Sequence, residues 1–527
     1  MKKQYINLKG CLMFATCLVA MEVGAQGFSP AALEQLKAQR LWFKSQNAAG
    51  TAFDDVQNYS DVKFNYDLEK GNFIRPLDAQ KNSTVGVSSE GFINLGNAYV
   101  WGAFSFEQEN LTDNGHNVSI TDPYRGMPYY CIDEHMSDWR NQFYNLKFRA
   151  ATPILKDHWA FGIEGTYIAS LAAKQRDPRI DTRFYTLELM PGVTYKINDN
   201  HKLGLSFLYT SIKEDSREAN ENNFIANYYY ELYGLGTAIK GVSNYGTYVT
   251  NYYGDRFGGA LQYNLSSEAW NVLLEGSYSI KAETAEKTYS EPELIGSVKD
   301  KLTKVSLNAI RQGESYTNYI SANYQNRHID GYQYIMKYDD SGSFLGWMEL
   351  YRNIRSTYET TTASFDYAIS KNMGAEYDWK VEFGVDYAKQ EDEYLMPNAK
   401  KSYENLTFNL GFKKNFVLGN NMNRRLLLDI HAAYNENLDG STYYSEEFKK
   451  SNGNYTVVNS VEKKLQNYYT SDYLRIGGAL TYSQQVKKDA KTNMFAKFAF
   501  DRMNNRTIHD CGLDVRTYLT ASLGCNF

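Results

Sequence analysis

Apolar and polar residues alternate along most of the chain from about residue 58 onward. In the final stretch, 515–527, Val515 and Leu519 fall on one face, and Arg516 and Tyr518 fall on the other. A period of two predicts β-strands, because successive side chains of a strand point to opposite faces. Such a strand either buries its apolar face in a soluble core or turns it to lipid around a polar lumen.

The alternating stretches are close to the roughly ten residues with which a tilted strand crosses a bilayer. We predict about 18 strands, with 14 and 16 as alternatives, because the first two stretches alternate least clearly. They lie near residues 60–69, 83–94, 98–109, 141–154, 158–172, 182–197, 201–213, 256–266, 269–285, 301–312, 316–328, 359–370, 378–391, 402–415, 424–436, 471–486, 492–504 and 515–527.

The connections between these stretches alternate between two classes. The short ones include 156–158, 198–200, 266–269, 313–316, 371–377, 418–423 and 487–491, and the long ones include 111–140, 211–255, 326–358 and 435–470. Outer-membrane barrels have short periplasmic turns and long external loops, whereas a soluble sandwich has no reason to alternate them. We therefore predict an all-β, transmembrane, antiparallel up-and-down β-barrel. The last residue, Phe527, agrees, because an aromatic end resembles the assembly signal of outer-membrane barrels.

The two faces of the predicted strands differ as a barrel in lipid requires. Polar residues such as Lys380 and Arg516 fall on the face assigned to the lumen, and apolar residues such as Phe408 fall on the lipid face. Four tryptophans follow short turns and predict an aromatic girdle at one membrane interface. They are Trp101, Trp159, Trp270 and Trp379.

Composition narrows the class further. The 527 residues include 45 Tyr and 27 Phe but 9 Pro, and the formal charge is −5. Mean hydropathy is −0.55, which is too polar for a helical membrane protein. Residues 1–25 resemble an export signal, with a basic start, an apolar stretch and small residues before a cut. Its loss removes three lysines and one glutamate and leaves a charge of −7, which argues against nucleic acid as a partner.

Residues 26–57 do not alternate and predict a short helix followed by small residues, which either plugs the lumen or lies in the periplasm. The barrel would then occupy residues 58–527. The plug candidates are Arg40, Trp42, Asn47 and Gly50. An end of the chain without any function remains the alternative.

Several short motifs resemble a family of outer-membrane β-barrel proteins known as domain of unknown function 6850. They are Arg40-Leu41-Trp42, Asn47-Ala48-Ala49-Gly50, Trp101-Gly102, Asp177-Pro178-Arg179 and Pro191-Gly192-Val193-Thr194-Tyr195. The resemblance implies a compartment and a fold, the outer membrane and a barrel, but no activity. The segment before the barrel is also remotely similar to the long-chain fatty-acid channel family, in which such a segment forms a hatch.

One external loop concentrates charge. Arg176, Asp177, Arg179 and Arg183 lie within ten residues of one another. Guanidinium groups bind carboxylates and phosphates in a bidentate way, so this loop would act as a selectivity filter if it folded into the lumen. The alternative is a solvated loop whose charges pair with one another.

Signals for catalysis are weak. Asp429 and His431 share the lumen face of one strand, but no nucleophile accompanies them, and Asp133 and Glu134 beside His135 do not predict a metal site. We therefore expect no enzyme, no cofactor and no metal. Cys131 and Cys511 both fall in external loops, where a disulfide or two separate thiols are alternatives.

Three functions compete. The first is a porin-like channel or accessory uptake component for small solutes. The second is a binding barrel whose Tyr-rich loops dock a surface lipoprotein or a TonB-dependent transporter, and the third is a surface hydrolase. Outer-membrane lipids are a partner under all three.

Overall fold

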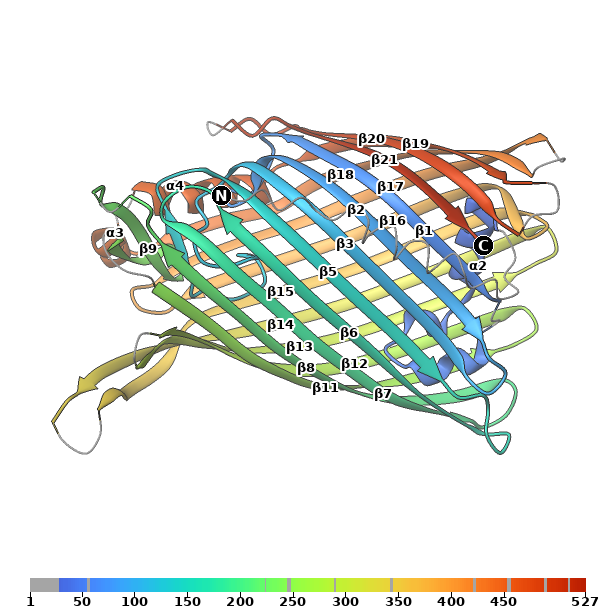
Figure 1. Ribbon diagram of the computed structural model, residues 1–527, viewed down its shortest axis with the longest axis horizontal. Coiled ribbons are helices and arrows are strands. Elements are labelled where there is room, and N and C mark those ends of the chain that lie inside the picture. The colour runs from blue at the N-terminus through green and yellow to red at the C-terminus, as the bar shows by residue number, and fades with distance from the viewer. Residues whose placement is uncertain are drawn as a thin grey trace.

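The computed structural model describes residues 28–54, 57–222, 224–243, 248–288, 291–341, 345–419, 423–452, 456–487, 491–509 and 512–527. In these ranges, eighteen strands form one sheet, in which each strand pairs antiparallel with the next barrel strand along the chain (Figure 1). The sheet closes where β21 (Val515–Asn526) pairs with β1 (Tyr59–Gly71), with Asp61 opposite Asn526. The predicted up-and-down barrel is confirmed, and each of the eighteen predicted strands is present.

The remaining barrel strands share this antiparallel pairing. They are β2 (Ala79–Asn94), β3 (Tyr99–Asn114), β5 (Ser137–Ala151), β6 (Trp159–Lys174), β7 (Arg179–Lys196), β8 (His201–Ala219), β11 (Tyr248–Ser266), β12 (Trp270–Thr288), β13 (Pro292–Gln312), β14 (Tyr316–Asp339), β15 (Gly346–Met373), β16 (Glu376–Tyr394), β17 (Ala399–Gly419), β18 (Arg424–Tyr444), β19 (Tyr473–Gln485) and β20 (Asn493–Asn505).

Many strands continue further toward the external end than the alternation predicts. The predicted strand at 316–328 runs on to Asp339, and the partner predicted at 359–370 begins at Gly346. Beyond the lipid both faces of a strand meet water, so the apolar period fades although the ladder of backbone hydrogen bonds continues. Figure 1 shows the β14–β15 hairpin projecting past the rest of the barrel.

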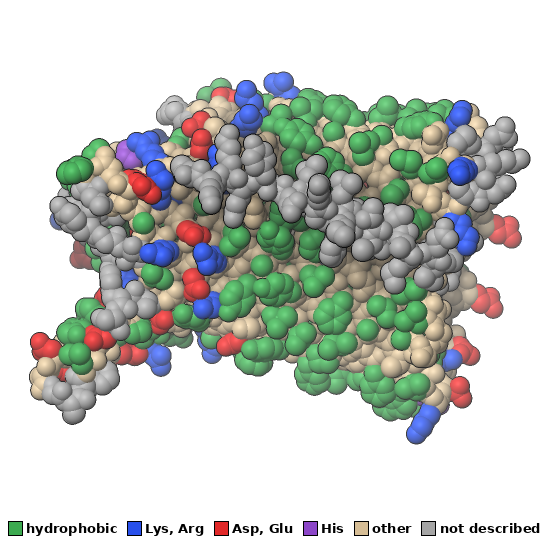
Figure 2. All heavy atoms as spheres, in the orientation of Figure 1, with side chains coloured by type: hydrophobic (Ala, Val, Ile, Leu, Met, Phe, Trp, Pro, Cys, Tyr) green, Lys and Arg blue, Asp and Glu red, His purple; other side chains and the backbone are tan. Residues whose placement is uncertain are grey.

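Apolar side chains cover the middle of the outer wall, and charged side chains gather at its two ends (Figure 2). Leu410 is 59% exposed and Leu523 is 63% exposed on this wall, while Arg516 is 4% exposed on the inner one. A closed sheet with an apolar belt and a polar interior is an outer-membrane β-barrel, because closure leaves no unpaired strand edge in the lipid. None of the described helices is long and apolar enough to cross a membrane.

The tryptophan girdle is confirmed for three of its four members. Trp159 is 42% exposed, and Trp270 and Trp379 share its outward face. Trp101 is a correction, because it points into the lumen and packs edge-on against Phe43 at 5.0 Å. Trp101 stands at one of the alternate strand positions whose side chains point into the lumen. Counting residues from the turn does not reveal which face a position has.

Residues 28–54 lie inside the barrel near the short turns, and we call them the N-terminal segment (Figure 1). The segment consists of helix α2 (Pro30–Gln39) and the 3-10 turns η1 (Trp42–Lys44) and η2 (Ala48–Phe53). Ser29 caps the helix by accepting a hydrogen bond from the Ala32 amide, and proline fits the first turn. Of the two predicted positions for this segment, the structure has the one in the lumen.

Three external connections pack together at the opposite end, and together we call them the outer cap. The structured part of the cap is a sheet of three strands with two helices. These are β4 (Cys131–Asp133), β9 (Asn227–Gly234), β10 (Thr237–Ser243), α3 (Glu446–Asn452) and α4 (Thr456–Tyr469). Ile132, Tyr230 and Val458 pack in one apolar cluster of the cap. Tyr230 belongs to the Tyr-rich external connection, which therefore packs against its neighbours in the cap.

Candidate functional site

Asn47 fixes the N-terminal segment to the barrel wall. Its side chain is fully buried, and its Nδ2 donates hydrogen bonds to the carbonyl oxygens of Val193 and Leu205 at 3.1 and 3.3 Å and to Oε1 of Gln262 at 3.0 Å. Its Oδ1 accepts from the Ala49 amide at 3.1 Å. One short side chain therefore ties a turn of the segment to β7, β8 and β11.

Three glycines of adjacent strands shape the surface on which η2 rests. A Cβ at Gly162 of β6 would overlap the backbone of Ala48 and Ala49, and a Cβ at Gly192 of β7 would overlap the Asn47 side chain. A Cβ at Gly204 of β8 would come within 2.9 Å of Asn47 Nδ2. The absence of side chains lets the turn approach the wall. We call these three glycines the glycine seat.

Arg149 of β5 holds the preceding turn. Its guanidinium donates to the carbonyl oxygen of Trp42 at 3.1 Å and to that of Ser45 at 2.8 Å, and it also pairs with Glu164. Its carbon Cζ lies 4.7 Å from the centre of the Phe43 ring. Trp42 itself is 1% exposed, so Arg149 holds a fully buried turn of the segment.

The other predicted plug residues are also in the lumen. Arg40 is 2% exposed, stacks over Tyr59 and Phe92, and donates to the Gln57 carbonyl at 2.9 Å. A Cβ on Gly50 would overlap the Trp42 ring, so glycine is required for this packing. All four predicted plug residues contribute to the contacts inside the barrel.

Glu34 joins α2 to the wall through charge. Its Oε1 accepts from Lys380 Nζ at 3.0 Å and from Lys413 Nζ at 2.9 Å, and its Oε2 accepts from the Tyr377 hydroxyl at 2.8 Å. Burial alone would raise the pKa of Glu34, but the two ammonium groups outweigh it and lower the pKa to about 2. The sequence does not reveal this contact, because the partners are more than three hundred residues away.

Asp54, the last residue of the segment, has a pKa that is shifted in the opposite direction from that of Glu34. Its carboxylate accepts hydrogen bonds from the Trp42 and Phe43 amides at 3.2 and 3.0 Å. Burial nevertheless raises the pKa of Asp54 to about 7, because these two donors offset only part of the loss of hydration. Asp54 therefore titrates near neutral pH while Glu34 does not.

A luminal cavity of about 580 Å³ lies beside the segment. The segment contributes Lys44 to its lining. The charged wall residues that line it are Lys380, Lys413, Arg475, Asp366, Glu382 and Asp429, together with His431. The cavity is large enough for a small solute and lined by groups of both signs.

The predicted pair Asp429 and His431 lies in this lining, as expected from its inward parity. His431 Nδ1 is 3.3 Å from Asp429, and its Nε2 is 2.8 Å from Asp501. Arg475 donates to Asp501 at 2.9 Å. The alternation of residues places Arg475 and Asp501 on the inner faces of their strands, but it does not join them to the histidine, because it does not fix the register between strands.

The outer cap is anchored by buried charges. Arg125 of the cap donates to Glu214 of β8 at 2.9 Å and pairs with Glu283 of β12, and both glutamate side chains are 0% exposed. Asp133 of β4 pairs with Lys174 of β6, again with both side chains fully buried. A buried charge without a partner is very unfavourable in free energy, so these ion pairs stabilise the cap in its position.

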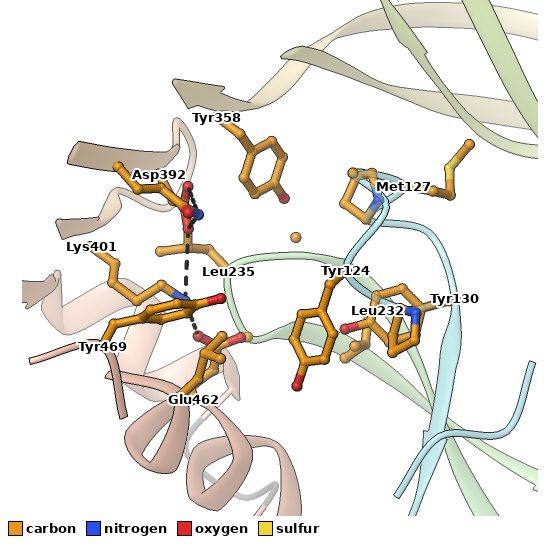
Figure 3. A pocket seen from close by; sticks show the side chains of 17 residues that line it. Tyr124, Met127, Tyr130, Leu232, Leu235, Tyr358, Asp392, Lys401, Glu462 and Tyr469 are labelled. Atoms are coloured by element: carbon orange, nitrogen blue, oxygen red, sulfur yellow. Dashed lines mark hydrogen bonds and ion pairs between the residues drawn. The ribbon is translucent and has the colours of Figure 1, made fainter. Parts of the chain in front are cut away.

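A second cavity of about 170 Å³ lies within the cap. Figure 3 shows Tyr358 directing its hydroxyl into this space, and Lys401 between Glu462 and Asp392 at its edge. Lys401 Nζ is 2.8 Å from Glu462 and 3.8 Å from Asp392. The pair with Glu462 joins helix α4 to the barrel wall, so the lining of this cavity also holds the cap closed.

The predicted arginine filter is corrected by the structure. Arg179 and Arg183 have the parity of the outward face, and their side chains are 46% and 68% exposed. They pair with Asp177 at 3.1 Å and Asp181 at 3.5 Å, and Arg176 is also exposed. The inward positions of this strand are taken by Ile180 and Thr182, so the charges pair with one another outside the lumen.

The structure describes one of the two external-loop cysteines. Cys131 is buried in the cap near Val118 and Tyr229, whereas Cys511 lies outside the described residues, as does the predicted signal at 1–25. The disulfide therefore stays a prediction. Within the described ranges no group of three His, Cys, Asp or Glu side chains is placed to hold a metal ion.

These features define an outer-membrane β-barrel that holds the N-terminal segment at one end, the outer cap at the other and a charged cavity beside the segment. Residues 48–527 match a family model described as "Family of unknown function (DUF6850)", and the chain belongs to that family. A search of the curated proteins finds no match.

Three solved structures align with most of this chain at low sequence identity. BauA, the ferric preacinetobactin receptor from Acinetobacter baumannii, aligns with a TM-score of 0.39 and 8% identity over 89% of this chain and 80% of that chain. FyuA, the ferric yersiniabactin uptake receptor from Yersinia pestis, gives 0.39 and 8% over 90% and 80%. The RagAB peptide importer gives 0.39 and 7% over 89% and 87%. The fatty-acid channel similarity is not shown by these comparisons.

Proposed function

We propose that this protein is an outer-membrane channel for small solutes, with the N-terminal segment as its gate. One observation carries the proposal: the segment fills the lumen beside a charged cavity of about 580 Å³, yet it is not a strand of the barrel. Along the chain, residues 55–58 connect it to β1. Its displacement would open the periplasmic end without breaking a pairing of the sheet.

The contacts of the segment suit a reversible gate. Asn47, Arg149 and Glu34 hold it through side-chain hydrogen bonds and ion pairs, which can be exchanged for water. The barrel strands satisfy their own backbone groups through continuous antiparallel pairing. We therefore expect the wall to keep its structure when the segment leaves.

Planar-bilayer recording tests the gate. A variant lacking residues 28–54 should show stable conductance, while the full chain should show short openings or none. Gly276→Leu is the matched control, because a Cβ at this position meets no neighbouring atom within 4 Å. A deletion variant that inserts and resists heat as a folded barrel, but does not conduct, would contradict the proposal.

A second candidate is a docking barrel for a surface lipoprotein or a TonB-dependent transporter. The observation that favours it is the projecting β14–β15 hairpin, where Leu345 is 63%, Leu350 is 58% and Tyr351 is 52% exposed. Apolar side chains so far from the lipid belt are suited to a protein interface. Replacing Leu350 and Tyr351 by serine should abolish co-purification of a partner from the native membrane; an unchanged set of co-purified proteins would count against docking.

A further inference from the structure

We propose that Lys380 and Lys413 form the binding site for an anionic group of the transported solute, and that Glu34 occupies this site when the gate is closed. A carboxylate or phosphate of the solute would take the place of the Glu34 carboxylate and release helix α2. This inference rests on the proposed channel function and adds the class of solute and the trigger for opening.

The two lysines are unusual neighbours. They lie directly opposite each other on β16 and β17, so the wall itself brings two ammonium groups together. Like charges at opposed positions of a sheet repel each other. A single oxygen, Oε1 of Glu34, bridges both groups at 3.0 and 2.9 Å. The wall thus presents a preformed two-cation site, and an element outside the sheet supplies its anion.

The wall itself satisfies the pair incompletely. Lys380 also contacts Glu382 at 2.5 Å, but the remaining carboxylates of the wall are 3.7 and 4.0 Å from Lys413 Nζ. Without Glu34, Lys413 therefore has no carboxylate within hydrogen-bonding distance among the described residues. An oxyanion that enters this position regains a charge-assisted hydrogen bond.

The site is accessible from the luminal cavity. Lys380 and Lys413 both line it, together with Lys44 and Arg475. Lys44 leaves with the segment, so the wall then presents three cations to the three carboxylates Asp366, Glu382 and Asp429, and the two opposed lysines favour an anion at their own position. His431, which also lines the cavity, lies between two carboxylates of the wall.

Binding of the solute and closure by Glu34 exclude each other. Both need the same space between the two ammonium groups, which one carboxylate fills in the closed form. A ligand that binds only the open form shifts the equilibrium toward it in proportion to its concentration. An anionic solute would thereby open its own channel.

Thiol labelling tests this competition in the full chain. The reporter is Ser45→Cys, a conservative change at a buried position of the segment, in a background where the three cysteines that follow the predicted signal are serine. We call the thiol introduced by this change the reporter thiol. Citrate and inorganic phosphate are the probes, with chloride at equal ionic strength as the reference. Citrate, phosphate or both should accelerate labelling of the reporter thiol at least about tenfold at saturation.

Two variants separate the site from a general loosening. In the absence of any oxyanion, the reporter thiol should be labelled about tenfold faster in the Glu34→Gln variant than in the chain with Glu34, because the bridge is lost. Glu90→Gln is the matched control, since it removes the other ion pair between α2 and the wall, Lys37 with Glu90, and leaves the lysine site intact. The control should keep its response to the oxyanions.

The decisive variant is Lys413→Met, which should lose the response to both oxyanions. A response that persists there, or equal acceleration by chloride, would overturn the inference. The outcome is independent of conductance. Oxyanion-dependent labelling without conductance would contradict the channel alone, and conductance of the deletion variant without an oxyanion response would contradict this inference alone.

Discussion

The two ends of this barrel are closed in different ways. The N-terminal segment fills the periplasmic end as a separate element, whereas the outer cap consists of connections that begin and end in barrel strands. The cap is secured by pairs with fully buried partners, such as Asp133 with Lys174. In the segment's bridge to the wall, Glu34 keeps 29% of its side chain exposed, and its lysines keep 12% and 17%.

This difference indicates which closure is suited to open. Opening the cap would separate fully buried charges from their ion-pair partners. It would also break up apolar clusters such as that of Ile120 and Tyr252. Releasing the segment also exposes buried contacts, such as those of Asn47 and Trp42, but its charged bridge to the wall at Glu34 is already partly hydrated. The periplasmic closure is therefore the gate in our proposal, and the cap is part of the fixed structure.

The largest expected effect is on the cap. Lys174→Met leaves Asp133 buried and unpaired, which should cost about 3–5 kcal/mol of local stability. Proteolysis of the loop around residues 115–137 should become faster, while labelling of the reporter thiol of Ser45→Cys should not change. The double variant with Asp133→Asn should recover most of the loss. Faster labelling of the reporter thiol in the single variant would show that the two closures are coupled.

The next effect concerns the segment. Asn47→Leu removes three hydrogen bonds to the wall and should destabilise the seated segment by about 3 kcal/mol, or roughly a hundredfold in labelling of the reporter thiol. Asn117→Leu is the corresponding change in the outer cap, where Asn117 donates to the Ile120 carbonyl at 2.6 Å. It should leave labelling of the reporter thiol unaltered. Equal labelling of the two variants would remove the distinction between the closures.

The smallest effect is a dependence on pH. The pKa of Asp54 is raised to about 7 in the seated segment from an ordinary value of 3.8, so seating should weaken as pH rises from 5 to 8, by about 2.5 kcal/mol. The lowered pKa of Glu34, about 2, acts in the opposite direction and only below about pH 4.5. Labelling of the reporter thiol, corrected for the reactivity of a free thiol at each pH, should increase across pH 5–8, and Asp54→Asn should make this profile flat. A slope retained by Asp54→Asn would assign the titration to another group.

The barrel itself could be predicted from the sequence because lipid imposes a pattern on it. Alternation, turn lengths and the final strand predict about eighteen strands in a barrel, and the pairing of β21 with β1 closes it. The predictions for Trp101 and Arg179 failed because they depend on which face of its strand a residue occupies. A shift of one position along the strand moves a side chain from one face to the other. The cap has no comparable pattern, because its strands meet protein or water on both faces.

The site was less accessible to prediction. The plug residues Arg40, Trp42, Asn47 and Gly50 are identifiable because they lie in a stretch that lacks the strand period and in the short motifs that carry the family resemblance. The bridge from Glu34 to Lys380 and Lys413 is not, because it depends on how strands far along the chain are brought to one side of the lumen. The signal for this bridge is a pair of like charges on opposed inner-face positions of two strands. It can be recognised only when the register between the strands is known.

The short connection between the segment and β1 sets how the gate would recover. Residues 55–58 are four in number, and four extended residues span at most roughly 14 Å. A released segment therefore stays at an effective concentration on the order of millimolar beside the glycine seat. Its return would be a first-order step, independent of the amount of protein in the membrane, so the channel would reset by itself as soon as the solute has passed.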